Sequence, residues 1–200
     1  MVSPYPRLTS TSVVVVSVSV SPTHSFSKKP VPSIRLVQGL GVEGDAHLGL
    51  TVQHLSRLHI KPPPPNLRQV HLVPAELFDE VASGSTPRVQ PGDLGENVTT
   101  KGIDLKRLSR GTRLRFVSAT GGGAKTNAPT VLVTGLRNPC PQIDKFQTGL
   151  KEKMLVRDES RQIVGRRAGV MATVETGGEI MPGMSILVEE PAVRFPLECV

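Results

Sequence analysis

The chain has 200 residues, a formal net charge of +7, and only 3% aromatic residues with no tryptophan. This length suits one domain. The scarcity of aromatic side chains disfavours a nucleic-acid surface, because bases stack on such side chains, so the charge favours an anionic small-molecule ligand. The core must come from Val, Leu and Ile, and frequent Gly and Pro divide the chain into short segments, which predicts a mainly β fold with a few short helices.

The N-terminal part of the chain holds the segment that most resembles a targeting signal. Residues 13–16 form an apolar run far shorter than the roughly 20 residues of a membrane span, and the Val-Ser alternation that follows has the period of a strand. We therefore expect a cytoplasmic protein that does not enter a membrane. A mitochondrial presequence stays open as an alternative, because residues 1–42 are rich in Ser and contain no acidic residue.

Short runs of Val, Ile, Leu and Thr between turn residues predict the strands. The last two, residues 169–175 and 185–188, are expected to pair as a hairpin through Gly177-Gly178. The sequence Gly121-Gly122-Gly123 is expected to form a flexible excursion between two earlier strands. The other strands are expected over residues 13–21, 34–37, 67–73, 114–118 and 130–136.

The two ends of the chain are predicted to lie outside the domain. Residues 1–12 look like a loose N-terminal tail, and residues 192–200, which include Cys199, are expected to fray. The domain would then span residues 13–191.

A helix is predicted after the strand over residues 67–73. Pro74 would occupy its first turn, and Leu77, Phe78 and Val81 have the spacing of its buried face. Gly84 would end it.

Cys140 stands in the sequence Arg137-Asn138-Pro139-Cys140-Pro141, directly after a predicted strand. Each residue before a proline is disfavoured in the α region, so this peptide should be stiff and extended. Ile143, Phe146 and Leu150 follow at helical spacing, which predicts a helix with Pro141 as its first residue and Cys140 as its N-cap. The helix dipole and Arg137 would both favour the thiolate, the form that ligates soft metals or carries sulfur. The alternative is a small buried hydrophobe.

Two further groups of polar residues deserve a functional and a structural interpretation. Residues 91–100 contain two glycines whose backbone N–H groups, with the hydroxyl group of Thr99, could bind a phosphate, although a structural turn explains the same pattern. Asp45-Ala46-His47 is the best candidate for orienting a ligand. The spacing of the histidines matches no familiar zinc site; they are His24, His47, His54, His59 and His71.

Taken in order, several segments together resemble the MOSC family, named after the C-terminal domain of molybdenum cofactor sulfurases. The resemblance covers roughly residues 13–190, and it includes the small stand-alone members such as the bacterial protein that detoxifies hydroxylaminopurine. The chain departs at Gly183-Met184, where the family has Gly-Asp, and it lacks room for the pyridoxal-phosphate domain of full sulfurases. The matching segments are Gly41-Val42-Glu43-Gly44-Asp45-Ala46-His47, Arg68-Gln69-Val70-His71-Leu72, Pro91-Gly92-Asp93-Leu94-Gly95-Glu96-Asn97, Gly111-Thr112, Thr134-Gly135-Leu136-Arg137-Asn138-Pro139-Cys140 and Gly169-Val170-Met171.

This resemblance implies a MOSC-type β-barrel and a cysteine, at the position of Cys140, that ligates molybdenum or carries a persulfide. It also implies the molybdenum cofactor, Mo-molybdopterin, whose phosphate would be held by cationic side chains and backbone N–H groups. Members of the reductase type reduce N-hydroxylated compounds. The residues expected to bind the cofactor are Lys28, Asp45, His47, Arg68, Gly95, Glu96, Asn97, Thr99, Arg137 and Asn138.

Three functions stay open at this point. The first is a molybdenum-dependent oxidoreductase with a small-molecule substrate. It would need an external electron-transfer protein, because two cysteines cannot supply the four thiolates of an iron–sulfur cluster. The second is a sulfur carrier or cofactor-binding protein without turnover of its own. The third, a nucleic-acid-binding module, is the least favoured, and the oligomeric state is open.

Overall fold

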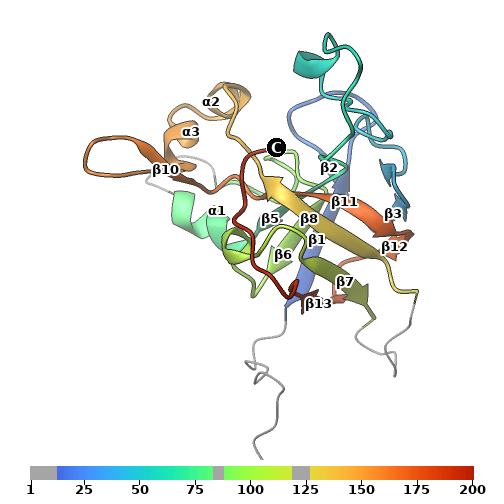
Figure 1. Ribbon diagram of the computed structural model, residues 1–200. Coiled ribbons are helices and arrows are strands. Elements are labelled where there is room, and N and C mark those ends of the chain that lie inside the picture. Colours follow the sequence, from blue (N-terminus) through green and yellow to red (C-terminus); the bar gives the residue numbers. More distant parts are fainter. Residues whose placement is uncertain (1–12, 83–87, 119–126) are drawn as a thin grey trace, which may run out of the picture.

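The computed structural model describes residues 13–82, 88–118 and 127–200, and its centre is a closed barrel of seven strands (Figure 1). Pairing of Val14 with Ser185 closes the ring. Two neighbouring strands, β5 and β6, run parallel, and the other neighbouring pairs in the ring run antiparallel. The strands in order round the ring are β1 (Val14–Val20), β6 (Val98–Lys101), β5 (Val70–Pro74), β11 (Val170–Thr176), β8 (Thr130–Leu136), β7 (Arg113–Val117) and β13 (Ser185–Glu189).

Aliphatic side chains fill the barrel, as the composition predicts. Val18, Leu72 and Val98 are completely buried, each from a different strand. The strand β7 shows the pattern clearly, because Leu114 and Phe116 point inward while Arg113 and Arg115 face outward. The predicted mainly β fold, a barrel with a few short helices, is therefore confirmed.

The predicted C-terminal hairpin is wrong. β11 pairs with β8 and β5, whereas β13 pairs with β7 and β1, so the two strands lie apart in the ring. The glycines at 177 and 178 do not form a tight turn between them. Instead Gly178 begins β12 (Gly178–Ile180), which pairs with β3 (Ile34–Val37) in a small sheet completed by β4 (Gly41–Val42). After β11 the chain leaves the barrel and pairs with β3, so the local hairpin that the two glycines suggested does not form.

Two more strands lie outside the ring. β2 (Lys29–Val31) pairs with the far half of β1. β9 (Leu155–Arg157) and β10 (Ile163–Arg166) form a separate hairpin, which projects beside the helices in Figure 1.

The helices are short and pack on the outside of the barrel. α1 (Glu76–Val81) buries Leu77, Phe78 and Val81 as predicted, while its predicted end at Gly84 lies outside the described residues, as do the tail over residues 1–12 and the triple glycine. Two 3-10 turns, η1 (Leu55–Arg57) and η2 (Leu105–Arg107), add single turns. Among the residues that the structure describes, no helix combines the length and the hydrophobicity needed to cross a membrane.

The single helix predicted after Cys140 is two short helices, α2 (Gln142–Phe146) and α3 (Leu150–Lys153). Between them Gln147 is extended and Gly149 is left-handed, with φ of +81°, so the helix cannot continue. Cys140 is not the N-cap, because Pro141 holds that position. The two helices, with α1, enclose a second apolar cluster that includes Ile143 and Leu150.

The C-terminal segment, predicted to fray, is instead paired with β8. Leu136 of β8 donates its N–H to the carbonyl of Glu198 (2.7 Å), and Val200 donates to the carbonyl of Leu136 (3.3 Å). Cys199 thus forms a parallel bridge with Leu136. Figure 1 shows the end of the segment beside the tip of β8, where the chain turns toward α2.

Candidate functional site

A pocket of about 410 Å³ opens beside Cys140, where several loops of the barrel meet. Four cationic and three imidazole side chains line it together with the thiol. No acidic side chain of the described residues lines it, so an anion would meet only attraction there. The charged, imidazole and thiol side chains in its wall are Lys28, Arg68, Arg137, Lys145, His24, His47, His54 and Cys140.

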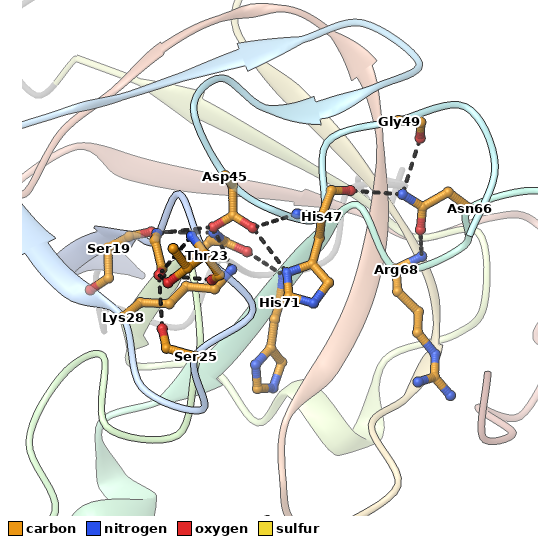
Figure 2. A network of polar contacts seen from close by, with 12 residues as sticks. Ser19, Thr23, Ser25, Lys28, Asp45, His47, Gly49, Asn66, Arg68 and His71 are labelled. Atoms are coloured by element: carbon orange, nitrogen blue, oxygen red, sulfur yellow. Dashed lines mark hydrogen bonds and ion pairs between the residues drawn. The ribbon is translucent and has the colours of Figure 1, made fainter. Parts of the chain in front are cut away.

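Asp45, buried behind the pocket, holds its loops together (Figure 2). Its Oδ2 lies 2.6 Å from Nζ of Lys28 and accepts a hydrogen bond from Nδ2 of Asn97 (3.0 Å). Its Oδ1 lies 3.0 Å from both the backbone nitrogen and Nδ1 of His47. Burial alone would raise the pKa of Asp45, but the hydrogen bonds from His47 and the charge of Lys28 hold it well below its usual range. Asp45 is therefore ionised at neutral pH.

This pairing changes the role of Lys28 and leaves Arg68, Arg137 and Lys145 as the cations of the pocket without an Asp or Glu partner in the described chain. The Lys28 side chain is 5% exposed and its charge is balanced by Asp45. Among the described residues no Asp or Glu carboxylate lies within ion-pair distance of Arg68 or Arg137. Burial and the charges of neighbouring arginines lower the pKa of Arg68 to about 10, which still leaves it charged at neutral pH. The pocket therefore carries a net positive charge.

The thiol of Cys140 lies within reach of one of these arginines. Arg137 and Cys140 line the pocket together, and interaction with the Cys140 side chain opposes the effect of burial, which lowers the pKa of Arg137. On the same short segment, Oδ1 of Asn138 accepts a hydrogen bond from Nε of Arg166 (3.0 Å), while Pro139 is buried. A partly exposed thiol beside a guanidinium, on a segment anchored at three successive residues, is well placed to hold a ligand.

Three histidine rings lie in contact along another wall of the pocket. The ring centroid of His47 lies 5.1 Å from that of His24 and 4.5 Å from that of His54. Burial, followed by the charges of His47 and Arg68, lowers the pKa of His54 to about 3, so this ring is neutral at physiological pH. Among the described residues, no group of three or more His, Cys, Asp or Glu side chains is arranged to hold a metal ion.

The neutral state of His54 predicts an acid-sensitive fold. In the unfolded chain His54 titrates near its ordinary value of 6.5, so between pH 6.5 and 3 the unfolded state binds a proton that the folded state does not. Stability must therefore fall as the pH falls through this window. Between pH 7 and 5 this single proton accounts for up to about 2 kcal/mol of unfolding free energy.

Urea unfolding at pH 7 and pH 5 tests this, with His54→Gln as the comparison. The variant keeps a polar, uncharged side chain, and every other group titrates equally in both proteins, so it should lose about 2 kcal/mol less than the wild type. Equal losses in the two proteins would show that His54 does not carry the effect.

Beneath the pocket lies a hollow of about 10 Å³, roughly enough for one water-sized atom. Nδ1 of His54, Nε of Arg68 and Nδ1 of His71 are buried and have no hydrogen-bond partner among the described residues. All three residues line the hollow. Buried polar atoms are rarely left unpaired, so these nitrogens fit a small ligand on the floor of the pocket. Nε of Arg68 would donate to it, whereas Nδ1 of His71 would accept from it, because neutral His71 already donates its Nε2–H to the carbonyl of Ala168 (2.8 Å).

The structure brings most of the residues predicted to bind the cofactor to this place. Lys28, His47, Arg68, Gly95, Arg137, Asn138 and Cys140 line the pocket, and Asn97 lines the hollow below it. Glu96 and Thr99 do not line either. The carboxylate of Glu96 accepts hydrogen bonds from Gly92 N–H (2.6 Å) and Thr99 Oγ1 (3.0 Å), so these residues stabilise the 91–97 loop from inside. Asp45 does not line the pocket either, and it contributes by holding Lys28, His47 and Asn97 in place.

Sequence reasoning missed part of the wall. Phe26 and His24 come from the loop after β1, and Leu55 from η1. These loops have neither a repeated pattern nor a motif. Composition could have pointed to Phe26, since aromatic residues are rare in this chain and Phe26 lies in a short Ser-rich loop.

Comparison with known proteins supports one family. The MOSC domain model matches residues 46–187. The crystal structure of the YUAD protein from Bacillus subtilis is similar with a TM-score of 0.69 and 26% identity, covering 90% of this chain and 97% of that one. YiiM from Geobacillus stearothermophilus shares the fold with a TM-score of 0.59 at 18% identity, covering 92% and 79%. YiiM from Escherichia coli does so with 0.57 at 16%, covering 93% and 73%. No curated protein sequence matches the chain. Because the family model covers well over half of the chain, the protein belongs to the MOSC domain family.

Proposed function

We propose that this protein binds the molybdenum cofactor in the pocket beside Cys140 and reduces N-hydroxylated small molecules with electrons from an external donor. One observation carries the proposal: a free thiol and two arginines without a described Asp or Glu partner line the same pocket. The thiolate is a soft ligand suited to a metal of this kind, and the arginines suit the phosphate of the pterin. Membership of a family associated with this cofactor supports the same conclusion.

The residues present fit the cofactor. Cys140 would supply the metal ligand, while Arg68 and Arg137 would bind the phosphate. Nε of Arg68, unpaired in the hollow, offers a further donor for an oxygen atom of the bound group. When bound, the cofactor would supply two-electron oxygen-transfer chemistry that the side chains of this chain do not provide.

The proposed reaction needs two electrons and two protons, since R–NHOH becomes R–NH₂ and water. The electrons come from an external electron-transfer protein. His47 is placed to handle protons, because its Nδ1 is held by the ionised Asp45 and its Nε2 is the nitrogen left for exchange. We place the reaction in the cytoplasm, where two free cysteines would stay reduced.

Metal analysis of purified protein tests the proposal. Protein made in a host that synthesises the cofactor should carry molybdenum in up to equal amount with the chain. It should also release a pterin whose oxidised form is fluorescent, and protein from a host unable to make the cofactor is the control. Protein from the competent host that is free of both molybdenum and pterin would contradict the proposal.

A sulfur carrier is the second candidate, because the guanidinium beside Cys140 would also stabilise a persulfide anion. Intact mass separates the two functions. A carrier should show a chain heavier by one sulfur atom at Cys140 after incubation with a sulfur donor. The reductase should turn over an N-hydroxylated purine with a reduced viologen dye as electron donor.

A further inference from the structure

Arg68 is held from outside the pocket by the C-terminal segment, here residues 198–200. Nη2 of Arg68 donates a hydrogen bond to a main-chain oxygen of Val200, the last residue of the printed sequence. This is the partner that the structure shows for the guanidinium, since Nε is buried without one and the Asp and Glu side chains of the described residues lie beyond ion-pair distance. A long, flexible side chain is thereby fixed in one position.

The segment itself is seated on β8 at a position where only glycine fits. A Cβ atom added at Gly135 would collide with the carbonyl oxygen of Glu198 and lie 2.7 Å from a methyl group of Val200. Gly135 does not have a positive φ, so the contact with residues 198–200 requires the small size of glycine and not its backbone freedom. Two hydrogen bonds with Leu136 add to this contact, and Leu197 packs against the barrel core.

We propose that residues 198–200 are a working part of the anion pocket: seated over Gly135, they hold the Arg68 guanidinium where it binds an anionic ligand. Arg68 touches the ligand, and the segment is a positioning element that acts through it. This inference rests on the proposed function only in requiring that the pocket bind an anion. It requires neither molybdenum nor turnover.

Gly135→Ala tests the inference without altering any residue of the pocket. Alanine is compatible with the backbone at this position and favours an extended strand over glycine, so β8 should persist while residues 198–200 are displaced. Hydrogen exchange of the Leu136 and Val200 amides, read by NMR, reports the displacement. The matched control is Gly165→Ala in β10, where the added Cβ would meet only the side chain of Val156.

The probe is inorganic phosphate, titrated by calorimetry into the cofactor-free protein. Displacing the segment should weaken phosphate binding about tenfold, the effect of losing one well-placed charge-assisted hydrogen bond. The Gly165→Ala control should bind phosphate like the wild type. In an Arg68→Ala background, Gly135→Ala should have no further effect, because the segment acts only through Arg68.

Three results would overturn the inference: a wild type that does not bind phosphate, unchanged affinity despite fast exchange at Leu136, or effects of the two substitutions that simply add. If Gly135→Ala does not fold, Val200→Pro carries the same test, because it removes the N–H that bonds to Leu136 and leaves β8 intact. Metal analysis decides the proposed function separately, so the two can fail independently.

Discussion

Replacing Cys140 with serine should remove molybdenum from the protein and abolish reduction of N-hydroxylated substrates, while leaving the fold intact. Serine is nearly isosteric with cysteine, and Cys140 is only partly buried, so little packing changes. The Cys140 carbonyl, which accepts a hydrogen bond from Ile143 N–H (3.1 Å), is unaffected. Sulfur is what the variant loses, since a hydroxyl group stays protonated at neutral pH and is a poor ligand for a soft metal.

The measurement is molybdenum content and turnover, with thermal unfolding as the test of the fold. The melting temperature should change by no more than about 2–4 °C, as expected for a free-energy change below 1 kcal/mol. Cys199→Ser is the control for a thiol outside the pocket wall: its side chain is exposed, and residues 198–200 pair with Leu136 through backbone atoms that the substitution leaves in place. If Cys140→Ser instead lowered the melting temperature strongly and kept metal and turnover, Cys140 would be a packing residue.

Local sequence features predicted the strands well where burial alternates with period two. Residues 34–37 and 130–136 form strands with the predicted bounds. The hairpin failed because strand partners are set by the whole ring. Gly177-Gly178 suggested a local turn, but the chain between the last two ring strands first pairs with β3.

The candidate site likewise has a part that local sequence could predict and a part that it could not. Arg137, Asn138 and Cys140 are close in sequence and could be predicted together. Arg68 and Lys28 were predicted as similar cations, yet Lys28 is neutralised by Asp45 and Arg68 is not. That difference depends on which loops meet in the folded protein, and no local sequence pattern predicts it. The contact between Arg68 and residue 200 spans 132 positions and was likewise beyond local reasoning.

The buried pair of Lys28 and Asp45 should be the most sensitive point of the fold outside the core. Asp45→Asn keeps the size of the side chain but leaves the Lys28 ammonium group without a counter-charge at 5% exposure. Breaking a buried ion pair from one side costs about 3–5 kcal/mol, a large share of the roughly 5–15 kcal/mol that stabilises a domain. Urea unfolding at pH 7 should therefore show a large fall in the midpoint.

The pH dependence and a double variant identify the cause. Burial lowers the pKa of Lys28 from its ordinary value of 10.5, and the charge of Asp45 opposes this. Without Asp45 the pKa of Lys28 falls further, so at pH values between this lowered pKa and 10.5 the unfolded chain binds a proton that the folded variant does not. The stability of Asp45→Asn should then rise between pH 7 and 9 by up to about 1.4 kcal/mol per pH unit, more steeply than that of the wild type.

Removing the second charge should restore most of the loss. In Lys28→Met with Asp45→Asn no buried charge remains, and replacing both partners of a buried pair with uncharged groups is often close to neutral. The double variant should therefore unfold near the wild-type urea midpoint and lack the rise between pH 7 and 9. If it were as unstable as Asp45→Asn alone, the hydrogen bonds of Asp45 to His47 and Asn97, and not its pairing with Lys28, would be what stabilises these loops.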